Sequence, residues 1–231
     1  MKARRLMYRK PWSPTPPIPS PSIPTSPNTI EVTGEGTISA APDKAIIVLG
    51  AVTENVSLTA AQNENARTVT NIVEALLRLS IPKEHIQTTQ YSIDIQYNYE
   101  DGKQTFRGYK VTHMLQVTVD KIDKTGLVVD TAVKSGANTV SSIQFTLANP
   151  EIAYSHALSL AIQNGQFKAN TIASTLGVTL HPIPTLVQEM SRTKEPAPYP
   201  VAAMYAQMEV TPIQPGELQI SALIRAAFTF S

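Results

Sequence analysis

Hydrophobic and polar residues alternate most regularly in the middle of the chain, between Tyr91 and Val119. Every second residue from Tyr91 to Tyr99 is aromatic or aliphatic, and the same period returns from Tyr109 to Val119 with His113 as its one polar member. Between these two runs lies Glu100-Asp101-Gly102-Lys103, a sequence with turn chemistry. A period of two places successive side chains on opposite faces of a strand, so the pattern predicts a long β-hairpin.

Before the hairpin, the chain predicts two strands and a helix. Residues 29–37 predict a short strand broken by Gly34 and Gly36, and residues 44–54 are almost continuously apolar, which is typical of a central strand covered on both faces. Apolar residues then recur with helical period over residues 58–79, where Thr59 opens a capping-box sequence.

After the hairpin, capping residues mark two further helices. Asp123 is expected to cap a short helix that ends near Gly136, and residues 139–147 predict a strand. Asn149-Pro150-Glu151 has the order of a helix start, and Gly177 is expected to end that helix. Its predicted apolar face consists of Ala153, Ala157, Leu160, Ala161, Ile172 and Leu176. The last predicted strand, residues 219–230, carries on one face Ile220, Ala222, Ile224, Ala226, Phe228 and Phe230.

These elements predict an α+β fold. From residue 44 to 147 their order is strand, helix, strand, strand, helix, strand, which is the split βαβ arrangement of an antiparallel sheet with both helices on one face. An additional long helix and the C-terminal strands extend it. The opposite face of the sheet is then solvated, or covered by a partner or by the second half of the chain.

Proline and charge divide the 231-residue chain unevenly. Eight of its 18 prolines lie between Pro11 and Pro27, and seven more lie between Pro182 and Pro215. Five basic residues precede the first acidic one, and without them 14 basic residues face 18 acidic ones, a net charge of −4. We therefore expect residues 1–28 to be a basic, proline-rich arm, and residues 29–231 to form one folded domain with a proline-rich loop at about 191–216. The arm is either a disordered spacer or a segment that docks on a neighbouring subunit.

Composition excludes several classes of protein. The absence of cysteine excludes disulfide scaffolds, thiolate metal sites and cysteine nucleophiles, and no apolar run approaches the length of a membrane span. The near-neutral net charge of +1 argues against a nucleic-acid partner. Arg9-Lys10-Pro11 stands where a signal peptide would have its apolar segment, so cleaved secretion is not expected. The sequence is compatible with two locations. The protein is either cytoplasmic or exported without a cleaved signal peptide, and an exported protein could associate with the cell surface.

A series of short matches resembles the bacterial SIMPL-domain family. In chain order they are Val32-Thr-Gly-Glu-Gly36, Ala41-Pro42-Asp43-Lys44-Ala45, Ile86-Gln87-Thr88, Gly108-Tyr109, Gly136-Ala137-Asn138 and Phe145, followed by a late helix with recurrent alanines. The family includes periplasmic immunogenic proteins and proteins linked to oxidative-stress tolerance. The resemblance implies an α+β fold that can build ring-like homo-oligomers and brings no agreed enzymatic activity.

Candidate catalytic and metal-ligating residues do not form recognisable motifs. The four histidines, His85, His113, His156 and His181, are too far apart in the sequence for a paired ligand motif, and no nucleophile or phosphate-loop signature occurs. His113 is expected to be a core or interface histidine with a hydrogen-bond partner. We therefore expect no enzymatic activity, no cofactor and no metal.

Candidate subunit contacts are more prominent. Tyr91, Tyr97, Tyr99, Phe106 and Tyr109 form an aromatic cluster at the hairpin tip, which either packs within one subunit or forms an interface. The 191–216 segment is either disordered or a loop that contacts another subunit. In the arm, Trp12 is a large apolar residue suited to such a contact. Those two segments add as candidates Met204, Tyr205, Met208 and Trp12. Arg107 and Arg225 are expected on solvated strand faces, with inter-subunit ion pairs as the alternative.

The preferred hypothesis is a self-associating structural protein, a homo-oligomeric ring or filament related to stress or the cell envelope. The alternative is a soluble binding module for a small molecule, a peptide or a cell-wall fragment.

Overall fold

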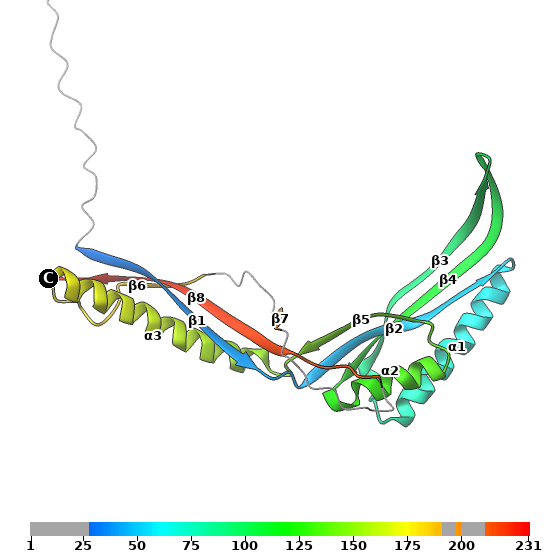
Figure 1. Cartoon of the computed structure of the whole chain (residues 1–231), viewed down its shortest axis with the longest axis horizontal. Coiled ribbons are helices and arrows are strands. Elements are labelled where there is room, and N and C mark those ends of the chain that lie inside the picture. Colours follow the sequence, from blue (N-terminus) through cyan, green and yellow to red (C-terminus); the bar gives the residue numbers. More distant parts are fainter. Residues whose placement is uncertain (1–27, 191–196, 200–210) are drawn as a thin grey trace, which may run out of the picture.

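The computed structural model describes residues 28–190, 197–199 and 211–231. The chain forms an elongated molecule of two lobes, each a sheet with helices on one face (Figure 1). The proline-rich arm lies outside the described residues, as do three of the loop residues proposed as contacts, Met204, Tyr205 and Met208, and Trp12 of the arm.

The hairpin lobe is a four-stranded antiparallel sheet with two helices. Its elements are β2 (Lys44–Asn55), α1 (Leu58–Arg78), β3 (Ile86–Glu100), β4 (Lys103–Val119), α2 (Thr125–Lys134) and β5 (Thr139–Thr146). The strand order is β3-β4-β2-β5, so β4 lies antiparallel between β3 and β2. The predicted split βαβ arrangement is therefore confirmed.

The core of the hairpin lobe lies between the sheet and its helices. Ile47, Leu49, Val117, Ile72 and Leu76 are almost completely buried there. The residues of β2 that point away from the helices are only half-buried. The expectation that this strand is covered on both faces is wrong, because α1 and α2 lie on the same side of the sheet.

The terminal lobe is built from segments at both ends of the described chain. It consists of β1 (Thr29–Ala40), α3 (Pro150–Leu176), β6 (Leu186–Glu189), β7 (Ala197–Tyr199) and β8 (Glu217–Thr229). β8 pairs antiparallel with β1 along its whole length, and β6 and β7 pair with its other edge. The even-numbered residues of β8 are buried against α3 as predicted, from Leu218 to Phe228.

Two glycines determine how β1 packs on α3. The strand is continuous through Gly34 and Gly36, so the predicted break is wrong. A Cβ atom at Gly34 would overlap the carbonyl oxygen of Ala161, and one at Gly36 would overlap that of Ala157. The glycines therefore mark a close backbone approach between strand and helix.

Apart from Tyr154 near its start, the buried face of α3 is made of small residues. Ala157, Ala161, Gly165, Ala169 and Ala173 recur every four residues and are buried against the sheet. Three of the large residues predicted for this face are exposed instead: Leu160 (42%), Ile172 (38%) and Leu176 (62%). The prediction failed because the close approach at β1 leaves room only for small side chains.

Two predicted helix caps are also wrong. Ser57 rather than Thr59 caps α1, and its hydroxyl accepts a hydrogen bond from the Ala60 amide at 3.5 Å. Asp123 lies in a 3-10 turn, Ile122–Lys124, and α2 begins after it without a side-chain cap. The start of α3 at Pro150 and its end at Gly177, which has a φ of +70°, agree with the sequence.

Hydrogen bonds join the lobes where the chain crosses between them. The Asp43 carboxylate accepts a hydrogen bond from the Ala148 amide at 2.6 Å, so it links the β1–β2 crossing to the β5–α3 crossing. On the return to β8, both the amide and the hydroxyl of Thr211 donate to Asp130 of α2, at 3.2 and 2.5 Å. We call residues 211–216 the strap, since they run from α2 back to β8 and place Ile213 against the core of the hairpin lobe.

Candidate functional site: an exposed aromatic face on the hairpin

The hairpin is built as its alternation predicts. β3 and β4 pair from Ile86 to the turn, where Asp101 and Gly102 have φ angles of 51° and 75°. Two consecutive residues with positive φ form the tight turn whose twist matches paired strands. Tyr97 lies opposite Phe106, and Ile95 lies opposite Tyr109, so these four side chains share one face.

A β-bulge brings the last two aromatics together. Phe106 and Tyr109 are three positions apart and would point to opposite faces of a regular strand. The pairing register shifts between Gln96 and Tyr97 and leaves Arg107 as the extra residue of β4, so both rings lie on one face with their centroids 5.3 Å apart. Gly108 stands in the bulge close to the Asn55 carbonyl. A glycine inside a strand pattern signals such a bulge, and the sequence contained this signal.

The shared face is exposed because the hairpin extends beyond the helices that cover the rest of the sheet (Figure 1). The exposed fractions are 52% for Tyr91, 41% for Tyr97, 73% for Tyr99 and 52% for Phe106, while Tyr109 is half-buried. The contact with α1 is at the base, where Gln62 donates to the Tyr91 hydroxyl at 3.3 Å. We call these five aromatic residues, together with Ile93 and Ile95, the hairpin face.

The structure places all five aromatic residues on one face of the hairpin, but Tyr91 lies at the base of the hairpin and not at the tip, where the cluster was predicted. Sequence reasoning omitted Ile93 (38% exposed) and Ile95 (50% exposed) from the candidate contacts, although they lie in the same alternating run. Only their position beyond the helices makes them part of an exposed surface.

His113 lies at the covered end of the hairpin face. Its Nε2 is 3.0 Å from the Thr88 hydroxyl, and its ring meets that of Tyr91 edge-on with centroids 5.3 Å apart. Partial burial lowers the pKa of His113 below its ordinary value of 6.5, which favours the neutral imidazole. The expected hydrogen-bond partner is present, and the side chain is partly buried and not part of the core.

The two arginines are exposed and form ion pairs within the chain. Arg107 donates to Glu54 of β2 at 2.8 Å, and Arg225 of β8 pairs with Glu31 of β1. Both side chains are about half-exposed, as expected for solvated strand faces.

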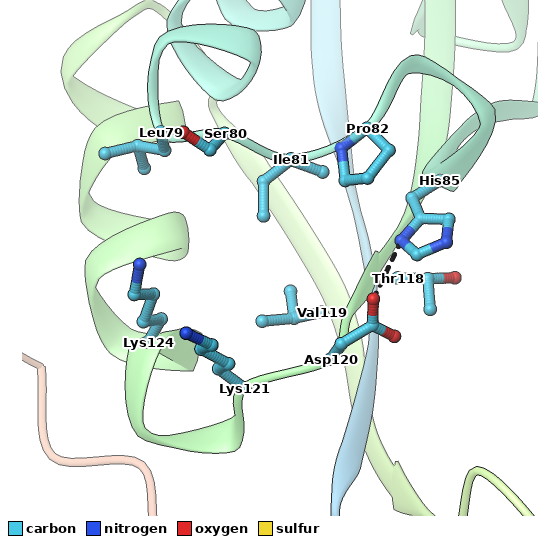
Figure 2. A pocket seen from close by; sticks show the side chains of 10 residues that line it. All are labelled: Leu79, Ser80, Ile81, Pro82, His85, Thr118, Val119, Asp120, Lys121 and Lys124. Carbon is cyan, nitrogen blue, oxygen red and sulfur yellow. Dashed lines mark ion pairs between the residues drawn. The ribbon is translucent and has the colours of Figure 1, made fainter.

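Titratable groups also meet at a small hollow of about 200 Å³, at the end of the hairpin lobe opposite the hairpin turn (Figure 2). The His85 ring faces Asp120 there, with Nδ1 3.5 Å from a carboxylate oxygen, and Lys44 lies 3.6 Å from the other oxygen. Its apolar lining includes Ile81, Pro82 and Val119. Sequence reasoning missed the His85–Asp120 pair, because the two residues belong to different elements and no motif joins them.

The described residues contain neither a cluster of metal-ligating side chains nor a membrane-spanning helix. In that part of the chain no three histidine or acidic side chains lie close enough to hold a metal ion. No helix among those described is long and apolar enough to cross a membrane.

Comparison with known families decides the affiliation. A family model named SIMPL, with the description "Protein of unknown function (DUF541)", matches residues 30–228. The chain belongs to the SIMPL family. The resemblance seen in the short ordered motifs is therefore confirmed.

Three bacterial relatives align with most of the chain. The 26 kDa periplasmic immunogenic protein of Brucella melitensis biotype 1 is 31% identical over 183 residues, which cover 77% of this chain and 72% of the relative. The uncharacterized protein YggE of Edwardsiella ictaluri is 27% identical over 185 residues, covering 80% of this chain and 76% of the relative. YggE of Escherichia coli strain K12 is 26% identical over 161 residues, covering 70% and 65%.

In this SIMPL chain, the residues that carried the resemblance have structural roles. Gly34 and Gly36 allow the approach of α3, and Asp43 links the two crossings between the lobes. Asn138 extends the edge of β2, since its side-chain amide accepts from the Val52 amide at 2.8 Å and donates to the Val52 carbonyl at 2.7 Å. The SIMPL motifs therefore specify the fold, whereas the hairpin face lies largely outside them.

Proposed function

We propose that this SIMPL chain is a non-enzymatic structural protein that associates with copies of itself through the hairpin face. The observation that carries the proposal is the row of aromatic and aliphatic side chains, each 38–73% exposed apart from Tyr109, on a hairpin that extends past its own helices. Large contiguous apolar surfaces on a protein usually mark interaction sites.

The size of the hairpin face fits a second copy of the same chain. Because an aromatic side chain has roughly 150–250 Å² of surface, the face offers on the order of 600 Å² per copy. A stable protein interface buries about 800 Å² per partner, so two such faces with a modest rim suffice.

The chemistry of the hairpin face favours an uncharged aromatic partner surface over a charged one. Its seven residues carry no formal charge, while the neighbouring ionic residues Asp94 and Lys110 alternate onto the opposite face. A face of this kind buries best against another uncharged aromatic surface, and a contact related by two-fold symmetry supplies one from the second copy.

Three titratable side chains of the described residues, those of His113, Asp43 and Asp130, have structural partners, which supports a non-enzymatic role. His113 lies within hydrogen-bond distance of Thr88 and meets the Tyr91 ring edge-on, and partial burial lowers its pKa, which favours the neutral imidazole. Asp43 and Asp130 bond backbone amides that join the lobes. Each of these groups has a structural partner that accounts for its position.

The test is a double substitution of the opposed pair Tyr97 and Phe106 by serine. The wild-type chain is expected to show, in sedimentation equilibrium, a mass above the 25.1 kDa of one chain. The double variant should associate at least tenfold more weakly and keep its circular dichroism spectrum, because both side chains are exposed.

Val133→Ser is the matched control, since this residue of α2 is 50% exposed in the hairpin lobe but lies outside the hairpin face. Its mass distribution should equal that of the wild type. A strictly monomeric wild type at high micromolar concentration would overturn the proposal, and so would a double variant of unchanged mass.

A second candidate function, a binding module for a small molecule, a peptide or a cell-wall fragment, is favoured by the open face of the same sheet. A groove of about 760 Å³ lies there, a volume typical of ligand sites. Val48, Val52 and Met114 contribute apolar surface, and the remaining lining is mostly hydroxyl-bearing, including Thr112 and Ser142. Added muropeptides should then raise the midpoint temperature of thermal unfolding by an amount that grows with their concentration, and Thr112→Val should reduce this rise. No rise with any of the muropeptides would remove cell-wall fragments as ligands of the groove.

A further inference from the structure

The outward side of α3 is almost without charge. Of its 27 residues, only Glu151 and Lys168 carry a formal charge, whereas four of the 21 residues of α1 do. A helix that keeps one side in water usually carries charges there. Depletion of charge together with an exposed aromatic residue is characteristic of the centre of an interface.

That aromatic residue is Phe167, which projects from α3 with 70% of its surface exposed. Beside it lies a hollow of about 440 Å³, lined by residues 31–33 of β1 and by Phe167, Lys168, Thr171 and Ile172. One surface therefore presents both a projecting ring and a space of sufficient size to receive one.

The edge of β1 at this hollow is already occupied by side chains of α3. Lys168 donates to the Thr33 carbonyl at 3.0 Å, and the Glu35 amide donates to the Asn164 side chain at 3.2 Å. An extended peptide that added to this edge would have to displace both bonds. The hollow is therefore suited to a side chain rather than to an additional strand.

The charges around the hollow are paired within the chain. Lys168 lies 3.7 Å from Glu35, and Arg225 pairs with Glu31. A charged partner would find few unpaired ions of opposite sign here, and a second copy with the same rim meets no uncompensated like charge.

We infer that this surface is a second self-association site, in which Phe167 of one copy inserts into the hollow of another copy across a two-fold axis. The inference rests on the proposed self-association and adds a contact independent of the hairpin face. The two sites belong to different lobes of the elongated molecule (Figure 1).

Two such sites on one chain lead to assemblies larger than dimers. One aromatic side chain contributes roughly 200 Å², so the α3 contact is weak by itself and becomes effective between copies already joined through their hairpins. Alternation of two different two-fold contacts generates assemblies with an even number of chains, closed or open according to the angle between the axes.

The first experiment compares Phe167→Ser with the double variant of Tyr97 and Phe106 by sedimentation equilibrium. The wild type should exceed a dimer, and Phe167→Ser should stop at a dimer joined through the hairpins. Ile183→Ser is the matched control, because this residue is 78% exposed in the terminal lobe and outside the hollow.

The outcomes separate the two proposals. If Phe167→Ser has the mass distribution of the wild type while the hairpin variant dissociates, this inference is wrong and the hairpin proposal stands. If Phe167→Ser lowers the mass and the hairpin variant does not, the hairpin proposal is wrong and this inference stands. A monomeric wild type overturns both.

A second measurement uses the absence of cysteine from the chain. Thr171→Cys places a single thiol in the hollow that receives Phe167 of the other copy, so in a two-fold contact the two copies of position 171 are offset by about one helical turn. A short bismaleimide cross-linker should therefore yield a covalent dimer from Thr171→Cys at least tenfold faster than from Ile183→Cys. Equal rates would contradict the two-fold contact.

Discussion

At the scale of single residues, the absence of a side chain determines how the terminal lobe packs. Gly34 of β1 lies where any Cβ would meet the backbone of α3 at Ala161 and Gly165. Both partners are backbone atoms inside regular elements, so neither can move aside without disturbing its own hydrogen bonds. The period-four stripe of alanines on α3 serves the same close approach from the helix side.

Gly34→Ala is therefore expected to destabilise the protein by about 2–3 kcal/mol, in the upper part of the usual range for overpacking. Urea unfolding followed by circular dichroism measures this directly. Thr33→Ala is the control, because the neighbouring side chain points to solvent and should cost no more than about 1 kcal/mol of strand propensity. Equal stability of Gly34→Ala and the wild type would show that α3 does not approach β1 so closely.

At the scale of elements, the strap couples the last strand to the hairpin lobe. Asp130 of α2 holds the first residue of the strap by two hydrogen bonds, and Ile213 follows onto the core. The hydrogen bonds from the Thr211 hydroxyl and amide hold the pKa of Asp130 below its ordinary value of 3.8. A depressed carboxyl pKa stabilises the folded state above pH 3.8, and the stabilisation is lost as the pH falls through the folded-state value.

We expect Asp130→Ala to expose the Thr211 amide, whose hydrogen exchange should become at least severalfold faster, while the amides of β2 and β4 keep their protection. In the wild type, the same amide should lose protection, relative to its intrinsic exchange rate, as the pH is lowered below 3.8. Asp123→Ala removes a nearby aspartate outside the strap contact and should change neither. Unaltered exchange at Thr211 in Asp130→Ala would mean that other contacts hold the strap.

At the scale of the whole molecule, the two lobes have separate cores. One is formed by β2, β4, α1 and α2, and the other by β1, β8 and α3. Because β1 and β8 come from opposite ends of the described chain, the hairpin lobe is inserted into the terminal lobe.

A fragment of residues 42–148 is therefore expected to fold alone. It keeps all six elements of the hairpin lobe and loses from its core only the packing of Ile213. Its circular dichroism should show helix and strand, and urea should unfold it in one cooperative transition. A fragment without such a transition would show that the hairpin lobe depends on the terminal lobe.

Local periodicity predicted most elements but not which faces become covered. The hairpin, the helix bounds near Leu58 and Pro150 and the last strand followed from patterns within a few residues of each other. The pairing of β1 with β8 joins residues about 190 positions apart, and no local pattern indicated it. The error at α3 has the same origin, since large residues such as Leu160 were assigned to the core without knowledge of the glycines opposite.

In the candidate site, too, local sequence patterns predicted the element, and the tertiary structure decided which of its faces is exposed. The sequence by itself determined that five aromatic residues share a hairpin, because alternation and turn chemistry are local properties of the chain. Only the tertiary structure decided that this face, with Ile93 and Ile95, is exposed, since exposure depends on where α1 ends relative to the hairpin. It also placed Phe167 beside a hollow formed with β1, a strand more than 120 residues away in the chain. Burial is a property of the packed molecule, and distant segments determine it.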